Sequence, residues 1–233
     1  MSDLKIFGET EFISSKRARV LSVKILSNGL RITLPSGKIK QDAIKWILDN
    51  KELIIRKQEK LRARKSRTLI RENEIIKTYT FSIIPCKAAR SDVFFNLNNG
   101  TLKIEYPDYA DLESDHLQQI CWRGIKYFLK KEAGRVLPEK LAKLANEHRF
   151  NYCDLKLQSG KTRWGSCSSK KNINLSIFLM LLPEHLIDYV ILHELCHTVE
   201  MNHSDKFWKL MDDVTEGKSK RLRAAIKNYE IPG

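Results

Sequence analysis

The chain has 233 residues, of which 42% are hydrophobic and 30% charged, and it carries a formal net charge of +14. This apolar content is enough to bury the core of one large or two small globular domains. The N-terminus lacks an apolar signal segment, and the longest apolar run, residues 177–182, is too short to cross a bilayer, so we expect a cytoplasmic protein without a membrane partner. The five scattered cysteines form no C-x-x-C pair, which argues against a disulfide framework.

The first predicted element is a β-hairpin. Residues 20–26 and 30–34 alternate apolar and polar side chains and flank Asn28-Gly29, the strongest short-range hairpin signal. Apolar spacing then predicts a helix from about Gln41 that continues into a basic segment. A strand over residues 78–84, ending before Pro85, and a second hairpin of residues 93–97 and 102–106 follow. The N-terminal part is therefore predicted to be rich in β-hairpins.

Positive charge is concentrated in this N-terminal part. Residues 1–105 contain 22 Lys and Arg against 11 Asp and Glu, whereas residues 106–233 contain 20 against 17. The segment from Lys51 to Arg71 alone has nine basic and two acidic residues. Such a run can be a surface that binds nucleic acid, but a solvated helix face or loop is the favoured interpretation, because no aromatic residue or known recognition motif lies among the charges. Nucleic acid is therefore one candidate partner.

A short acidic stretch at residues 107–115 precedes a more helical half, and we place a domain boundary between residues 110 and 111. Residues 117–131 and 138–149 have helical apolar spacing and are separated by Gly134. Strands at residues 152–157 and 173–176 follow, and the apolar segment from Pro183 to Glu200 predicts a buried helix. The predicted fold class is α+β, with a basic, hairpin-rich region at 1–110 and a compact, mainly helical domain at 111–233.

The predicted buried helix contains the sequence His193-Glu194-Leu195-Cys196-His197. Residues four apart lie on one helical face, so the two imidazoles can bind the same metal ion, and neutral imidazole suits Zn²⁺. Glu194 lies beside the first ligand, where it can act as a general base towards a water molecule at the metal. The alternative is a pair of core histidines, but two such rings in an apolar helix are costly without a partner.

A catalytic zinc site usually has three protein ligands and one open position. His203 is the predicted third ligand, with a helix end near Glu200 and a left-handed residue at Asn202 that turns the chain back. Ser204 would then cap a further helix. If the first helix instead continued, Glu200 would share the face of His197 and become the third ligand.

Several ordered motifs resemble those of a known family. They are Thr-Arg-Trp-Gly-Ser-Cys-Ser at 162–168, Ile-Asn-Leu at 173–175, Leu-Pro at 182–183, Asp-Tyr-Val at 188–190, His-Glu-Leu-x-His at 193–197 and Asn-His-Ser-x-x-Phe-Trp at 202–208. Over residues 110–215 the chain resembles the YgjP-like metallopeptidases, relatives of the SprT and Wss-type zincins. The resemblance implies a compact zincin fold, one zinc bound by His193, His197 and His203, and a catalytic Glu194. Glu200 stands where the longer metzincin motif has glycine.

The segment at 162–168 and the ligand helix supply candidate substrate-binding residues. Arg163 and Tyr189 are candidates for stabilising the oxyanion; the alternatives are a buried ion pair for Arg163 and a core position for Tyr189. Zincins bind extended peptides along an edge strand beside the active-site helix, and the segment from Arg163 to Cys167, which includes Trp164, has the position of such a strand. A nucleophilic role for Cys167 is not supported by any Cys-His spacing.

Three functions remain open. The first is a zinc-dependent metallopeptidase that cleaves peptides or unfolded proteins, with Glu194 as general base. The second is a protease of SprT type that is brought to nucleic acid by its basic part. The third is a binding module in which zinc holds the fold. Structural zinc sites normally have four protein ligands, and the sequence offers three, which favours catalysis.

Overall fold

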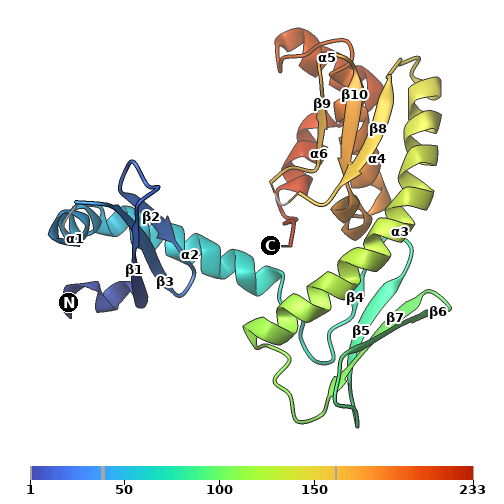
Figure 1. The fold of residues 1–233 in the computed structure, drawn as a ribbon. Helices are drawn as coiled ribbons and strands as arrows, with labels where there is room; N and C mark the ends of the chain where they lie inside the picture. Colours follow the sequence, from blue (N-terminus) through green and yellow to red (C-terminus); the bar gives the residue numbers. More distant parts are fainter. Residues whose placement is uncertain (1, 38–39, 161, 233) are drawn as a thin grey trace. The chain divides into compact units, whose positions relative to one another are not determined.

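In the computed structural model, which describes residues 2–37, 40–160 and 162–232, the chain divides into two compact units, Met1–Thr68 and Leu69–Gly233 (Figure 1). The boundary predicted at residue 110 falls inside the second unit. The reason is that one hydrophobic core begins at Ile70 and extends from the sheet at residues 76–107 into the helices that follow. In the described part of the chain, none of the helices has both the length and the apolar surface needed to span a membrane.

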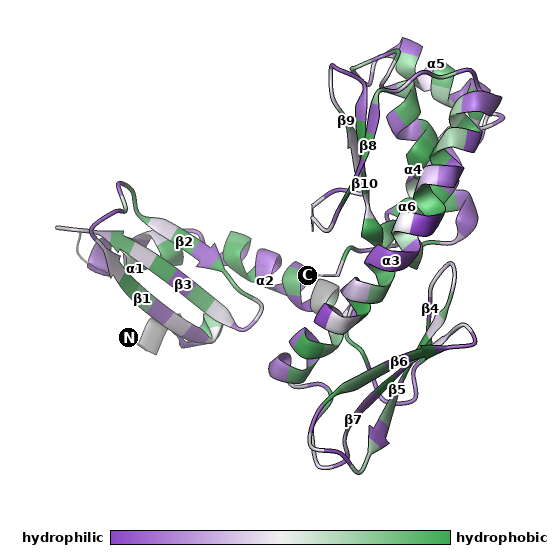
Figure 2. Cartoon of the chain, turned by 45° about the vertical axis from the view of Figure 1, so that its right-hand side comes forward, coloured by the Kyte–Doolittle hydropathy of each residue, from purple (hydrophilic) through white to green (hydrophobic). Residues whose placement is uncertain are grey.

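The first unit consists of a three-stranded sheet and its helices. Its elements are η1 (Ser2–Phe7), β1 (Glu9–Ser15), β2 (Ser22–Ile25), β3 (Gly29–Pro35), α1 (Lys40–Asp49) and α2 (Lys51–Arg67). β2 and β3 form the predicted hairpin, with Ile25 opposite Leu30. β1, which was not predicted, pairs with β3 in parallel, and Figure 2 shows alternating hydrophobic and hydrophilic bands along both strands.

A buried glutamine attaches α2 to the rest of the first unit. Ile47 of α1 is fully buried in the small core of this unit, and Gln58 of α2 is 3% exposed. The Gln58 Nε2 lies within 3.2 Å of three backbone carbonyl oxygens, those of Phe7, Leu26 and Gly29. Because unpaired buried polar groups are costly, these hydrogen bonds fix α2 against the hairpin.

The second unit begins with a four-stranded sheet in the order β4-β5-β7-β6. The strands are β4 (Ile76–Lys77), β5 (Ser82–Ala88), β6 (Phe94–Asn98) and β7 (Thr101–Pro107). β6 and β7 form the second predicted hairpin, and the turn residues Asn99 and Gly100 both have the positive φ that a type I′ turn requires. β5 continues through Pro85, where an end was predicted. Pro85 lies beyond the residues that pair with β4, at the edge of the sheet, where a missing N–H is tolerated.

α3 (Asp115–Glu147) is a single helix of 33 residues, not the two helices predicted. The Ser114 hydroxyl caps it by accepting a hydrogen bond from Leu117 N. The helix continues through Gly134 and Pro138 because its apolar face is buried along its length. Pro138 cannot donate to the carbonyl of Gly134, four residues earlier, and Figure 1 shows the helix bending along its course, as expected for an internal proline.

The remaining elements of the second unit carry the candidate site. They are β8 (Asp154–Gln158), β9 (Gly165–Cys167), β10 (Asn172–Ser176), η2 (Ile177–Leu181), α4 (Glu184–Cys196), α5 (Asp205–Val214) and α6 (Ser219–Ile226). β8 and β10 are two of the predicted strands and pair in parallel, and β9, which lies within the segment predicted as an edge strand, pairs antiparallel with β10 at the edge of this sheet. α4 is the predicted apolar helix (Figure 2) but ends at Cys196, before the predicted end near Glu200.

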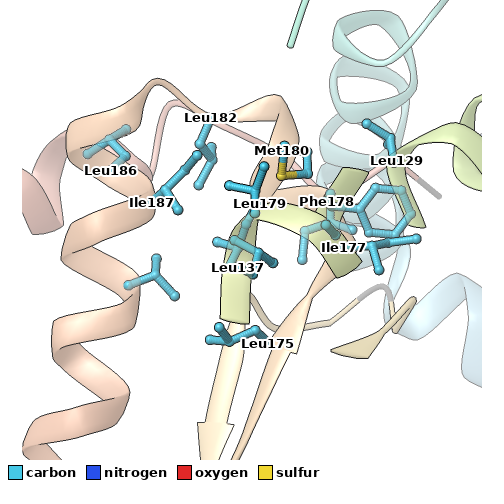
Figure 3. Packing of buried hydrophobic residues seen from close by; sticks show 14 of the residues in the cluster. Leu129, Leu137, Leu175, Ile177, Phe178, Leu179, Met180, Leu182, Leu186 and Ile187 are labelled. Carbon is cyan, nitrogen blue, oxygen red and sulfur yellow. The ribbon is translucent and has the colours of Figure 1, made fainter. Parts of the chain in front are cut away.

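Hydrophobic and polar contacts fix α4 against α3. Figure 3 shows Phe178 and Met180 of η2 in one cluster with Leu137 of α3 and Ile187 of α4, and all four side chains are buried. At the start of α4, the Nζ of Lys140 lies 2.7 Å from one carboxylate of the helix and 2.9 Å from another, those of Glu184 and Asp188. These contacts position the helix that carries the candidate metal ligands.

Candidate metal centre and active site

Three histidines converge at the C-terminal end of α4. His193 lies in its last turn, His197 is its C-cap residue, and His203 lies in the loop before α5. Their ligand nitrogens are all within 4.8 Å of one another, and Nε2 of His193 is 3.0 Å from Nε2 of His203. Helical geometry brings the first two rings together, one turn apart. Ser204, the N-cap of α5, fixes the third directly before that helix.

This arrangement fits a divalent metal ion bound by imidazole nitrogens. Two nitrogens at about 2.0–2.1 Å from a tetrahedral ion are roughly 3.3 Å apart, close to the separation of the His193 and His203 nitrogens. His197 directs Nδ1 at the carbonyl oxygen of Glu200, 3.0 Å away, which leaves Nε2 as the ligand atom. Burial, and then the neighbouring histidines, lower the pKa of His193 to about 3, so its ring is neutral and able to bind a metal at neutral pH.

The loop leads to His203, the predicted third ligand, but the end of the helix and the turn that follows it differ from the prediction. The cluster contains His203 and not the carboxylate of Glu200, which contributes its backbone carbonyl to the His197 ring. Among the described residues, those with positive φ do not include Asn202, so the turn is not made by a left-handed residue there. The helix ends earlier instead, and the Glu200 N–H donates to the Cys196 carbonyl at 2.9 Å, which closes the chain into a turn.

Glu194 of α4 is buried against β9. The residue is 5% exposed, and burial raises the pKa of its carboxyl to about 8, an effect that the Arg163 guanidinium opposes. β9 approaches so closely that a Cβ at Gly165 would lie 2.6 Å from Glu194 Oε1 and 2.7 Å from Glu194 Cγ. Only glycine allows this approach. An edge strand beside this helix was predicted from the sequence, but its close packing on Glu194 was not.

Two aromatic residues of α5 support the ligand rings. Phe207 stacks on His197 with ring centroids 4.5 Å apart and planes at 26°, and Trp208 stacks on His203 at 5.7 Å and 22°. Stacked neighbours restrict rotation of the imidazoles. From the sequence these residues were recognised as part of the motif at 202–208, without a role of their own. The available signal was their spacing, four and five residues after His203.

The site opens into a cavity of about 370 Å³. The three predicted substrate-binding residues, Arg163, Trp164 and Tyr189, all line it, together with His193, Glu194 and His203. Gly165, in the predicted edge-strand segment, also lines it. Other lining residues had no predicted role, and they include Trp208, Arg223, Ile226 and Lys227. α6 was missed because it contains no motif.

The structure also bears on the alternatives for three of these positions. Tyr189 is buried at 4% exposure, yet it borders the cavity with its ring centroid 6.1 Å from that of His193, and burial raises the pKa of its hydroxyl. Arg163 is exposed, and a buried ion pair is therefore not its role. Burial, and then Glu194, raise the pKa of the Cys167 thiol, which disfavours a nucleophilic thiolate.

The sequence matches the YgjP-like, metallopeptidase domain family over residues 19–229. The match spans most of the chain, so the chain belongs to this family of metal-dependent proteases. The match extends well beyond residues 110–215, over which the motifs were recognised, and it includes most of the first unit. The family assignment and the three-histidine cluster thus agree on a metallopeptidase site.

Two crystal structures of archaeal metallopeptidase zymogens resemble part of the chain. They are Pyrococcus abyssi abylysin and Methanocaldococcus jannaschii jannalysin, each 21% identical to this chain. The alignments cover 40% and 39% of this chain and 93% of each of those chains, with TM-scores of 0.37 and 0.35. No curated protein matches the sequence.

Proposed function

We propose that the protein is a zinc-dependent peptidase that hydrolyses peptides or unfolded proteins, with Glu194 as general base. The observation that carries the proposal is the convergence of three imidazoles beside a buried carboxylate, at a site that opens into one cavity. Zinc is one of the divalent metals that imidazole ligands suit. A site with three protein ligands leaves a position open for chemistry, whereas structural zinc sites are closed by four.

A zinc ion held by His193, His197 and His203 would supply Lewis acidity, lowering the pKa of water towards about 7 and polarising the substrate carbonyl. Glu194 accepts the proton of the attacking water and returns it to the departing amine. Burial favours the protonated form of Glu194 and a nearby dication favours the carboxylate, so both forms are accessible during turnover. Tyr189 and Arg163 are the candidate donors to the developing oxyanion.

The substrate is expected to bind as an extended chain along β9. This strand lies at the edge of its sheet, and its first residue, Gly165, lines the cavity beside Glu194. An edge strand offers backbone N–H and C=O groups to a further strand, so a peptide added there would pass directly by the carboxylate. Arg163 and Trp164 precede the strand and line the cavity, so they would contact side chains of the bound peptide.

Glu194→Gln tests the proposal. Gln keeps nearly the same shape, so zinc content and melting temperature should equal those of the parent. Peptide cleavage should fall by about 10⁴-fold or more, at or above the top of the usual range for a general base, because the amide cannot accept a proton. Unchanged cleavage by the zinc-loaded variant would remove Glu194 from the mechanism. A zinc-loaded parent that cleaves none of a broad panel of unfolded substrates would favour a structural role for the metal.

A second candidate function, recruitment to nucleic acid, is favoured by the charge of the first unit. Residues 1–68 contain 17 Lys and Arg against 7 Asp and Glu, which is +10 of the net +14 of the chain. Much of this charge is on α2, where Arg56, Lys57 and Lys60 are exposed, while the side chains of Arg64 and Lys65 lie outside the described part. An exposed basic helix attracts phosphates without reading sequence.

Replacement of Arg56, Lys57 and Lys60 by Ser tests this candidate. The parent should retard DNA or RNA at low salt, with affinity that falls steeply as salt rises, and the triple variant should bind much more weakly with a shallower salt dependence. A matched control is the triple replacement of three exposed lysines of the second unit, Lys206, Lys209 and Lys220. Equal loss in both variants, or no binding by the parent, would refute recruitment through α2.

A further inference from the structure

Three cationic side chains line the active-site cavity. Arg163 precedes β9, Arg223 lies on α6, and Lys227 directly follows α6. Among the described residues that line the cavity, Glu194 is the single carboxylate. Glu194 is buried against Gly165 and serves proton transfer in the function proposed above. The cavity is therefore cationic, and such a surface concentrates anionic groups.

Arg223 is held in place by an aromatic ring that also touches a metal ligand. Its guanidinium carbon lies 4.5 Å from the centroid of the Trp208 ring, and the Trp208 ring also stacks on that of His203 with an angle of 22° between their planes. Stacking fixes the planar guanidinium while leaving its N–H groups free to bind in the plane. In the described part of the chain, no carboxylate pairs with Arg223, which is exposed.

We propose that Arg223 is a specificity-determining residue that binds a substrate carboxylate close to the bond that is cleaved. The inference rests on the peptide hydrolysis proposed above and adds a substrate class to it. A guanidinium matches a carboxylate with two parallel hydrogen bonds, which a point charge does not. The carboxylate has two possible sources, an Asp or Glu side chain beside the cleaved bond or the C-terminus of a short substrate.

The position of Lys227 extends the same cationic face. It follows Arg223 by four residues, so the two side chains lie one helical turn apart, and Ile226 lies beside them in the lining of the cavity. Arg163 belongs to a different wall, next to the strand that we expect to bind the substrate backbone. A substrate with acidic residues near the cleaved bond would thus meet cations from two separate elements.

The test uses the zinc-loaded, full-length protein and a peptide that it cleaves. Each residue beside the cleaved bond is replaced in turn by Glu, Gln or Lys, and each peptide is made as the free acid and as the C-terminal amide. We expect kcat/KM for one Glu peptide to exceed that for its Gln partner, or the free acid to exceed the amide, by about 5- to 50-fold. Which comparison shows the preference identifies the source of the carboxylate.

Variants of Arg223 then assign the preference to this residue. Arg223→Gln should abolish it, Arg223→Lys should keep part of it, and Arg223→Glu should invert it in favour of Lys peptides. Arg221→Glu, an exposed change of equal charge on the same helix, should leave the preference intact. The ratio between paired substrates is the decisive readout, because a merely structural defect lowers both members of a pair equally.

Calorimetric binding of the same peptides to the Glu194→Gln protein provides a readout that does not depend on turnover. If the parent cleaves no peptide, the proposed hydrolysis fails. The role of Arg223 is then still supported if the Glu194→Gln protein binds Glu peptides more tightly than Gln peptides and the Arg223→Gln, Glu194→Gln double variant does not. Equal cleavage and equal binding of Glu and Gln peptides and of acids and amides, or a preference that survives Arg223→Glu, would overturn the inference.

Discussion

Gly165→Ala should disable the site from the strand that faces the carboxylate. The added Cβ would lie 2.6 Å from Glu194 Oε1, 2.7 Å from Cγ and 2.9 Å from Cδ, whereas contacts between non-bonded heavy atoms are favourable at about 3.5–4.0 Å. Because Glu194 is 5% exposed, it has little room to rotate away, so the strand or the carboxylate must move by roughly 1 Å. A displacement of that size costs about 10²-fold in rate.

Peptide cleavage, zinc content and thermal unfolding of Gly165→Ala together check this reasoning. Overpacking should lower stability by about 1–3 kcal/mol. Zinc should be retained, because none of the three atoms nearest to the added Cβ belongs to a ligand histidine. The control is Gly134→Ala on α3, where a Cβ meets nothing within 4 Å and a gain of about 0.5–1 kcal/mol with unchanged activity is expected. Full activity in Gly165→Ala would show that Glu194 does not depend on this contact.

Three further outcomes are expected. His203→Ala should retain much less zinc in metal analysis, and full occupancy in that variant would place the third ligand elsewhere. Lys140→Met should leave zinc content unchanged but destabilise the fold by about 1–2 kcal/mol, measured as a lower melting temperature, because two carboxylates of α4 lose their partner. Since the pKa of His193 is lowered in the fold, the metal-free protein should lose stability as pH falls from about 6.5 towards 3, and His193→Gln should reduce that slope in urea unfolding.

The features that could be predicted from the sequence are those determined by near neighbours in the chain. The β6–β7 hairpin has the predicted Asn-Gly turn at Asn99-Gly100, whereas the β2–β3 hairpin forms where it was predicted but turns at Ser27-Asn28, because Leu26 pairs with Gly29. The two histidines at the end of α4 come together through helical periodicity. Ser204 is the N-cap of α5, as predicted, because its hydroxyl accepts a hydrogen bond from the backbone N–H three residues later. Short-range signals therefore placed the metal ligands within the chain.

The features that were missed depend on contacts distant in the sequence. α3 continues through Pro138, at a position that costs a helix about 3 kcal/mol in isolation, because its buried face outweighs that penalty. β9 lies within the segment predicted as an edge strand, but its close packing on Glu194 joins residues far apart in the chain and was not predicted. The boundary of the first unit follows a core that no local pattern reveals, and Arg223 enters the site from a helix without a motif.

The three ligand histidines lie within eleven consecutive residues, whereas Gly165 and Glu194 are 29 positions apart. The metal cluster is thus a nearly local structure, formed by one helix end and the loop that follows it. The wall that holds Glu194 is non-local and exists only once the sheet of β8, β9 and β10 has docked on α4. Metal uptake and the placement of this carboxylate should consequently be separable during folding, and we expect a partly folded chain to bind its metal ion before Glu194 is in place.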